Sequence, residues 1–350
     1  MAGTMMAEPA TVVVGIDTHA DTHVAVALSN LGARLGCISV PTTVRGFAEL
    51  LGWARGLGEV TTFGIEGTGS FGATLMRFLQ DEKQLVVEVS RPDRRIRRQD
   101  GKSDPIDAEA AARTVLSGKA TGIPKSGDGR VEMIRSLRVA RRSALKARTQ
   151  AANQLHALVI TCPESLRSRL HPLAASALAQ LVAKFRPGPM DGPEAAAKLA
   201  LRHIGRRYVF LDAEIASLDG ELDVLVAKAA PALLELVGVG TDVAGALLVA
   251  AGDNPERLGG EASFARLCGA APLPASSGKT TRHRLSRGGD RIANNALWRI
   301  VIVRMRCDAR TRCYVDRRTK EGLTKREIIR CLKRYVARDV FRCLEGVDEL

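Results

Sequence analysis

Four carboxylates occupy positions where the sequence predicts that side chains converge: Asp17, Glu66, Asp104 and Asp107. Residues 11–16 form a β-branched, apolar run that is followed directly by Asp17. Residues 61–65 form a similar run that is followed by Glu66. Such runs are typical of buried central strands, so both acids are predicted at strand ends. Each also has a plainer interpretation, because Asp17 is compatible with an ordinary polar strand end and Glu66, among glycines, with a surface turn.

The other two acids are predicted on one helix. Pro105 suits the first position of a helix that begins near Asp104, and residues three apart share a helix face, so Asp104 and Asp107 are expected to be neighbours. The pair is also compatible with an N-cap and its N3 partner, as in a capping box. Carboxylates from two strands and a helix repel one another unless Mg²⁺ or Mn²⁺ is bound. Together the four acids therefore predict a two-metal site that acts on a phosphodiester.

The charge of the chain agrees with a nucleic-acid substrate. In 350 residues the formal net charge is +14, a balance that commonly accompanies nucleic-acid binding. Two basic clusters are predicted to contact phosphates, although a run of charges is usually a solvated face. The first precedes the helical acids and the second follows on a later helix: Arg91, Arg94, Arg95, Arg97, Arg98 and Lys102, then Arg135, Arg138, Arg141, Arg142, Lys146 and Arg148.

Hydrophobic periodicity predicts the elements that must position these residues. In chain order they are strands at 12–17, 23–28 and 35–40, a helix at 44–56, a strand at 60–66, a helix at 70–81, a strand at 84–89 and a helix at 104–117. Three successive strands followed by alternating helices and strands is the order of ribonuclease-H-like domains. A glycine-containing linker is expected at 118–129.

The rest of the chain is predicted to be mainly helical. A long basic helix at 131–160 and a later helix with a leucine-rich coiled-coil seam are compatible with either an antiparallel hairpin or a dimerising stalk. Residues 236–248 resemble a helix-hairpin-helix that offers backbone N–H groups to a phosphate, or a plain packing unit of two helices. Beyond them Ser277 precedes Gly278 and is followed by several arginines, a composition that by itself most often marks a turn.

Five motifs in this order resemble the DEDD serine transposases of bacterial insertion sequences, the bridge-RNA-guided recombinases, from about residue 11 to residue 345. They are Gly-Ile-Asp-Thr (15–18), Ile-Glu-Gly-Thr-Gly (65–69), Lys-Ser-Asp-Pro-Ile-Asp-Ala (102–108), Val-Gly-Val-Gly (237–240) and Pro-Leu-Pro-Ala-Ser-Ser-Gly (272–278). The resemblance implies an α/β ribonuclease-H/RuvC-like catalytic domain at 11–122, a helical coiled-coil linker at 130–232 and a mainly α transposase domain at 233–345.

The resemblance also implies a mechanism and partners. Asp17, Glu66, Asp104 and Asp107 would hold Mg²⁺ or Mn²⁺, and Ser277, with Ser276 as the alternative, would attack DNA to form a serine-phosphate link. Expected partners are donor and target DNA, a structured guide RNA and further copies of the chain in a dimer or tetramer. The side chains expected to contact nucleic acid are Arg94, Arg95, Arg97, Arg98, Lys102, Arg138, Arg142, Arg282, Arg287 and Arg291.

The chain departs from the family pattern in two places. Val237 stands where many members have proline, and Asn294 and Asn295 stand where many have paired arginines. The second departure leaves open which side chains contact the DNA backbone there, and Arg282, Arg287 and Arg291 are the candidates.

Other residues narrow the setting. The seven cysteines, an odd number without a CxxC pair, predict reduced thiols, and Cys268 is expected in the core. His19 and His23 could approach the metal, but two histidines at a turn between strands are more often surface residues, and both are expected at the surface. No secretion signal or membrane-spanning apolar run is evident, so neither secretion nor membrane spanning is expected. Together with the resemblance to transposases of bacterial insertion sequences, this predicts a cytoplasmic, nucleoid-associated bacterial protein.

Three other functions are compatible with parts of the sequence. One is a junction-resolving, metal-dependent nuclease that uses water as its nucleophile. Gly-Ile-Asp-Thr also suggests the phosphate loop of an actin-like sugar kinase, but the second Asp-x-Gly loop of such kinases is missing and the basic charge has no use there. The third is a non-catalytic RNA-binding protein.

Overall fold

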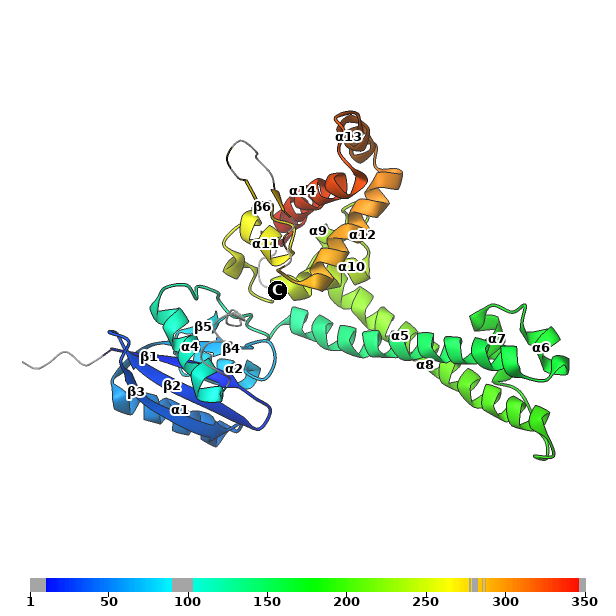
Figure 1. The fold of residues 1–350 in the computed structure, drawn as a ribbon, viewed down its shortest axis with the longest axis horizontal. Coiled ribbons are helices and arrows are strands. Elements are labelled where there is room, and N and C mark those ends of the chain that lie inside the picture. The colour runs from blue at the N-terminus through cyan, green and yellow to red at the C-terminus, as the bar shows by residue number, and fades with distance from the viewer. Residues whose placement is uncertain are drawn as a thin grey trace, which may run out of the picture. The chain divides into compact units, whose positions relative to one another are not determined.

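The computed structural model describes residues 11–89, 103–276, 278, 283–284, 286 and 288–345. These residues form two compact units (Figure 1). The N-terminal unit holds the chain up to Gly127 together with Asn254–Gly259, and the C-terminal unit holds Asp128–Asp253 and the chain from Gly260 onward. The helical hairpin and the C-terminal helices thus fall in one unit, and residues 254–259 return to the other.

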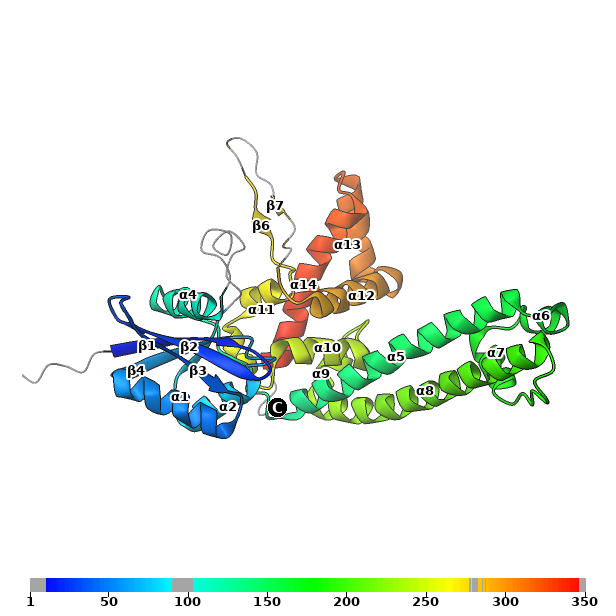
Figure 2. The ribbon, with the colours of Figure 1, turned by 60° about the horizontal axis from the view of Figure 1, so that its bottom comes forward.

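A five-stranded sheet with the order β3-β2-β1-β4-β5 forms the centre of the N-terminal unit (Figure 2). Its strands are β1 (Thr11–Thr18), β2 (Thr22–Ser29), β3 (Arg34–Pro41), β4 (Glu59–Glu66) and β5 (Val86–Val89). β1, β2 and β3 pair in antiparallel fashion, whereas β4 runs parallel to both β1 and β5. This mixed α/β topology is consistent with the predicted ribonuclease-H-like fold.

Helices cover both faces of the sheet because side chains alternate along each strand. α1 (Val44–Leu57) and α2 (Ala73–Asp81) pack on the face that contains Val12, Val14 and Ile16. α4 (Asp104–Leu116) packs on the opposite face, where its alanines contact Val13.

Gly15 sets how closely α4 approaches β1. A Cβ atom on Gly15 would lie 2.1 Å from the backbone nitrogen of Ala112 and 2.2 Å from the carbonyl oxygen of Ala108. Such distances are far below van der Waals contact, so only a residue without a side chain permits this packing. The close approach brings the first turn of α4 to the end of β1.

In the C-terminal unit, α5 (Arg130–Thr161) and α8 (Pro193–Ala229) form an antiparallel hairpin (Figure 1). α6 (Glu164–Leu170) and α7 (Ala175–Val182) pack together at its closed end. Two ion pairs, Arg141 with Asp219 and Arg148 with Asp212, step in opposite directions along the two helices, as antiparallel packing requires. The hairpin alternative for the coiled-coil seam is thus observed within one chain, and a dimerising role of these helices stays a prediction.

Six further helices and a short hairpin complete the C-terminal unit. They are α9 (Pro231–Leu234), α10 (Thr241–Ala251), α11 (Glu261–Leu267), α12 (Arg291–Cys307), α13 (Ala309–Lys320), α14 (Lys325–Glu345), and the strands β6 (Leu273–Pro274) and β7 (His283–Arg284). The turn between α9 and α10 packs on α12, where Arg304 Nε donates to the Val237 carbonyl at 2.9 Å. In the part of the chain that is described, no helix is both long and apolar enough to cross a membrane.

Candidate active site

Two of the four predicted acids end neighbouring parallel strands. The register pairs Ile16 of β1 with Ile65 of β4, so Asp17 and Glu66 are the next residues of the two strands. Thr18 Oγ1 donates to the Glu66 carbonyl at 2.8 Å and ties the strand ends together. Because Gly15, two residues before Asp17, faces α4, alternation assigns Asp17 to the α4 side of the sheet as well.

The other two acids lie in the first turn of α4. Asp107 is buried, whereas the side chain of Asp104 is half exposed. Ser103 has extended backbone angles and is the N-cap, so Asp104 is the first helical residue. The capping-box alternative, in which Asp104 is the N-cap, therefore does not describe this turn.

Asp104 and Asp107 lie close enough to Asp17 for their charges to act on its carboxylate. Burial raises the pKa of Asp17, and the charges of Asp107 and Asp104 act in the same direction against the opposing effect of His19. His19 Nε2 lies 3.1 Å from Asp17 Oδ2 and 3.4 Å from Asp104 Oδ1. One ligand atom from each of Asp17, His19 and Asp104 lies within 4.8 Å of the others, a separation suited to a shared cation.

The two histidines of the β1–β2 turn have different environments. His19 is exposed, as predicted, although it contacts two acids. The surface prediction for His23 is wrong, because its ring is 0% exposed and stacks on Phe47 with centroids 5.7 Å apart. His23 falls on the same side of β2 as Ala25 and Ala27, which belong to the core under α1 and α2. The alternation of residues 23, 25 and 27 along β2 is the sequence pattern that indicates a buried His23.

The predicted nucleophile lies outside the described residues. So do Arg282 and Arg287, and all of Arg94, Arg95, Arg97, Arg98 and Lys102. In sequence, Ser277 falls between β6 and β7, whose register pairs Leu273 with Arg284. Cys268, just before this hairpin, is fully buried and burial raises its pKa to about 12, so the prediction of a core thiol is confirmed.

Asn294 supports the base of the β6–β7 hairpin. Its Nδ2 donates to the carbonyls of Cys268 at 2.7 Å and Gly269 at 3.2 Å, while its Oδ1 accepts from Lys333 Nζ at 3.0 Å. At this residue, which departs from the family pattern, the side chain thus connects the turn before β6 to α14. No sequence pattern predicted this contact of Lys333, because its partner Asn294 is distant along the chain.

The second basic cluster is largely engaged in ion pairs inside the C-terminal unit. Arg138 donates to the carbonyl of Asp242 at 2.6 Å and to its carboxylate at 2.8 Å. Arg135 pairs with Glu132, in addition to the two pairs that join α5 to α8. Arg142 is exposed and, among the described residues, has no carboxylate within ion-pair distance. Nucleic-acid contact by Arg138, Arg142 and the exposed Arg291 stays a prediction.

Comparison with known families assigns the two ends of the chain. Residues 14–163, which contain all four acids, match the IS110-type DEDD family model described as a transposase. Residues 230–316, which contain Ser277 and Asn294, match the model described as the transposase IS116/IS110/IS902 family. No curated protein matches the chain. Two separate stretches of the chain thus match transposase models of the IS110 type, which supports a DNA transposase or recombinase.

Proposed function

We propose that this chain cuts and rejoins DNA at the acid site, with Mg²⁺ or Mn²⁺ held by Asp17, Glu66, Asp104 and Asp107. The observation that carries the proposal is the convergence of Asp17 with the first turn of α4, beside the end of β4. Carboxylate oxygens are the ligands that these hard cations prefer. The raised pKa of Asp17 reports burial and repulsion that a bound cation would offset.

Bound metal ions would polarise the scissile phosphate and stabilise the charge that develops on it. The residues of the chain fix the site: Gly15 lets α4 approach, and the buried Asp107 is held on that helix. His19 Nε2 lies within contact of the carboxylates of Asp17 and Asp104, at the same end of the sheet.

For the covalent step we assign Ser277 as the nucleophile. Its Oγ forms a bond to phosphorus as a phosphorus–oxygen bond of the DNA strand breaks, the serine proton passes to solvent, and the departing sugar oxygen takes up a proton from solvent. The serine-phosphate link keeps the energy of the broken bond for rejoining to a second DNA. Support comes from the motif that Ser277 shares with serine transposases and from the family match over 230–316.

Choice of target is assigned to a structured guide RNA, and the working form to a dimer or tetramer. The net charge of +14 supports RNA as well as DNA binding. Base pairing with a guide would supply the sequence specificity, while the protein recognises backbone and shape.

One experiment tests the catalytic proposal. The protein is incubated with guide RNA, labelled DNA and Mg²⁺, then denatured, and both joined DNA and label attached to protein are measured. Asp17→Asn, Glu66→Gln, Asp104→Asn and Asp107→Asn are each expected to lower strand transfer by at least about 100-fold, as for removal of one catalytic group. Asp21→Asn, at an exposed acid in the β1–β2 turn, is the matched control and stays active.

Ser277→Ala in the same assay is expected to bind DNA normally and to form no adduct, since one hydroxyl contributes chemistry and little binding area. Ser276→Ala is its control. An adduct that survives Ser277→Ala but not Ser276→Ala would assign the neighbouring serine. If neither serine matters and free ends accumulate, water is the nucleophile and the protein is a junction-resolving nuclease.

A further inference from the structure

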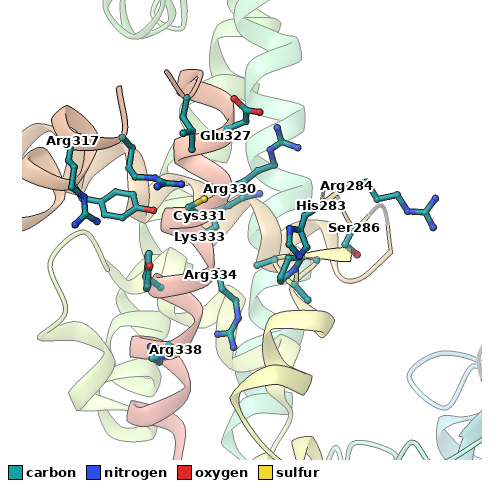
Figure 3. A pocket seen from close by; sticks show the side chains of 18 residues that line it. His283, Arg284, Ser286, Arg317, Glu327, Arg330, Cys331, Lys333, Arg334 and Arg338 are labelled. Atoms are coloured by element: carbon teal, nitrogen blue, oxygen red, sulfur yellow. The ribbon is translucent and has the colours of Figure 1, made fainter. Parts of the chain in front are cut away.

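A cavity of about 990 Å³ lies in the C-terminal unit between the β6–β7 hairpin and helices α13 and α14 (Figure 3). Its volume is near the upper end of the roughly 300–1,000 Å³ typical of ligand pockets. Arginines from three elements line it, including Arg284 of β7, Arg317 of α13 and Arg330 of α14. Among the described lining residues, Glu327 is the one carboxylate. The cavity therefore favours an anionic occupant.

Among the described cations of this lining, Lys333 is the most deeply buried. Lys333 is only 7% exposed, and its pKa is lowered by burial and by the charge of Arg330. In the described part of the chain its ammonium donates to Asn294 and has no carboxylate within ion-pair distance. An ammonium has three donors, and a buried charge without a counterion is costly. By contrast, Arg334 and Arg338 are already paired with Glu261.

Two tyrosines give the same cavity a flat, apolar side. Tyr314 and Tyr335 pack edge to face with ring centroids 5.6 Å apart, and Tyr335 remains 48% exposed. Arg317 lies over the Tyr314 ring, 5.3 Å from its centroid. Exposed aromatic rings beside arginines are the usual platform on which unpaired nucleic-acid bases stack.

We propose that this cavity binds a short single-stranded stretch of nucleic acid, with a phosphate at Lys333 and Arg330 and a base against Tyr335. A duplex fits less well, because its bases are stacked on one another and do not present a free face to a ring. Through Asn294, Lys333 is connected to the carbonyls of Cys268 and Gly269 in the turn that leads into β6. The strand would thus lie beside the hairpin whose connecting segment contains Ser277.

The test measures binding to the full-length protein in EDTA, where no metal-dependent cleavage occurs. The probes are fluorescein-labelled oligothymidylate and oligouridylate of about 12 nucleotides, with a duplex of the same length, followed by anisotropy over a range of salt concentrations. Lys333→Met and Arg330→Gln are each expected to reduce the slope of log affinity against log salt by about 0.7, the value for one phosphate contact on a single strand. Tyr335→Leu is expected to weaken binding about tenfold while leaving the slope unchanged.

Arg326→Gln is the matched control, because it removes the same charge from an exposed position of α14 outside the lining. The control is expected to bind as the wild type does. Since Lys333 is buried, Lys333→Met is used only if its unfolding midpoint is retained; Arg330→Gln and Tyr335→Leu carry the test in either case.

Three results would overturn the proposal: unchanged binding in Arg330→Gln and Tyr335→Leu, an equal loss in Arg326→Gln, or tighter binding of the duplex that Tyr335→Leu does not alter. The single strand that shows the larger loss identifies DNA or RNA as the source. Asp17→Asn is expected to bind both probes normally in EDTA. Failure of DNA joining and failure of this binding site are therefore distinguishable.

Discussion

At the scale of single residues, His23 shows how the core of the N-terminal unit depends on protonation. Burial lowers the pKa of this imidazole below its ordinary value of 6.5. The folded protein therefore holds His23 neutral at pH values where the unfolded chain already binds a proton. The contribution of the neutral ring to stability is full above about pH 6.5 and is lost as the pH falls through the lower pKa of the folded state.

We expect acidification from about pH 7.5 to pH 5.5 to lower the free energy of unfolding by up to ~1.4 kcal/mol per pH unit through this one residue. His23→Phe, which keeps a ring against Phe47, should reduce that dependence, whereas His171→Gln at an exposed histidine should not. Urea unfolding at several pH values measures the effect. An equal pH dependence in wild type and His23→Phe would show that His23 does not control it.

The sequence predicted the elements that carry the acids, but it did not predict the contact made by the buried Lys333. Asp17 and Asp104 followed from strand and helix patterns that extend over a few residues. The contact of Lys333 with Asn294 joins residues 39 positions apart, and no local pattern encodes such a pair. The alternation of residues along β2 indicated that His23 is buried. A polar residue next to a turn is usually exposed, however, and this favoured the wrong interpretation.

At the scale of elements, the packing of α4 on β1 positions half of the proposed site, and Gly15 is the residue on which it depends. Gly15→Ala places a Cβ atom 2.1 Å from a backbone nitrogen, so helix or strand has to move. We expect a loss of at least ~1–3 kcal/mol of stability, the usual range for overpacking, together with loss of strand transfer because the acids separate.

Gly52→Ala in α1 is the control for this change. A Cβ atom there has no heavy atom within 4 Å, so alanine should stabilise the helix by ~0.5–1 kcal/mol and leave activity intact. Urea unfolding measures the stability of both variants, and strand transfer is measured under conditions in which both remain folded. Full activity in Gly15→Ala would mean that α4 tolerates a shift without displacing the acids.

The element boundaries were largely predictable and the pairing of the long helices was not. β1, β4 and α4 begin and end within about two residues of their predicted limits, the ordinary precision of such boundaries. The leucine seam of α8 was predicted, but a seam has the same pattern whether its partner is another helix of the chain or another copy. The antiparallel pairing of α8 with α5 became visible only in ion pairs such as Arg148 with Asp212.

At the scale of the whole molecule, the chain passes between its two units three times, after Gly127, after Asp253 and after Gly259. Asn254–Gly259, here called the return segment, belongs to the N-terminal unit although both of its neighbours along the chain belong to the other. Asn254 Nδ2 donates to the Pro124 carbonyl at 3.0 Å, and its Oδ1 accepts from the Ser126 amide at 3.1 Å. No sequence pattern predicted that the return segment packs on the N-terminal unit, because its contacts join residues more than a hundred positions apart.

Arg257 is a second anchor of the return segment. Its Nε donates to the Ile123 carbonyl at 2.7 Å, its Nη2 lies 3.5 Å from Glu88 Oε2, and its side chain is only 9% exposed. Arg257→Met keeps the buried stem but leaves both acceptors without their donor, which costs ~1–3 kcal/mol for a buried group. We expect faster amide hydrogen exchange at residues 120–126 and 254–259 in this variant, with the β1–β4 core unchanged.

Arg55→Met removes an exposed ion pair with Glu82 from the same unit and is the control, since such pairs contribute ~1 kcal/mol or less. The proposed acids lie in the N-terminal unit and Ser277 belongs to the chain of the C-terminal unit, so a loosened return segment should slow strand transfer more than it weakens nucleic-acid binding. Unchanged exchange at 120–126 in Arg257→Met would show that this arginine does not anchor the segment. Faster exchange with normal strand transfer would show that the anchor stabilises the fold and that the joining of DNA does not depend on it.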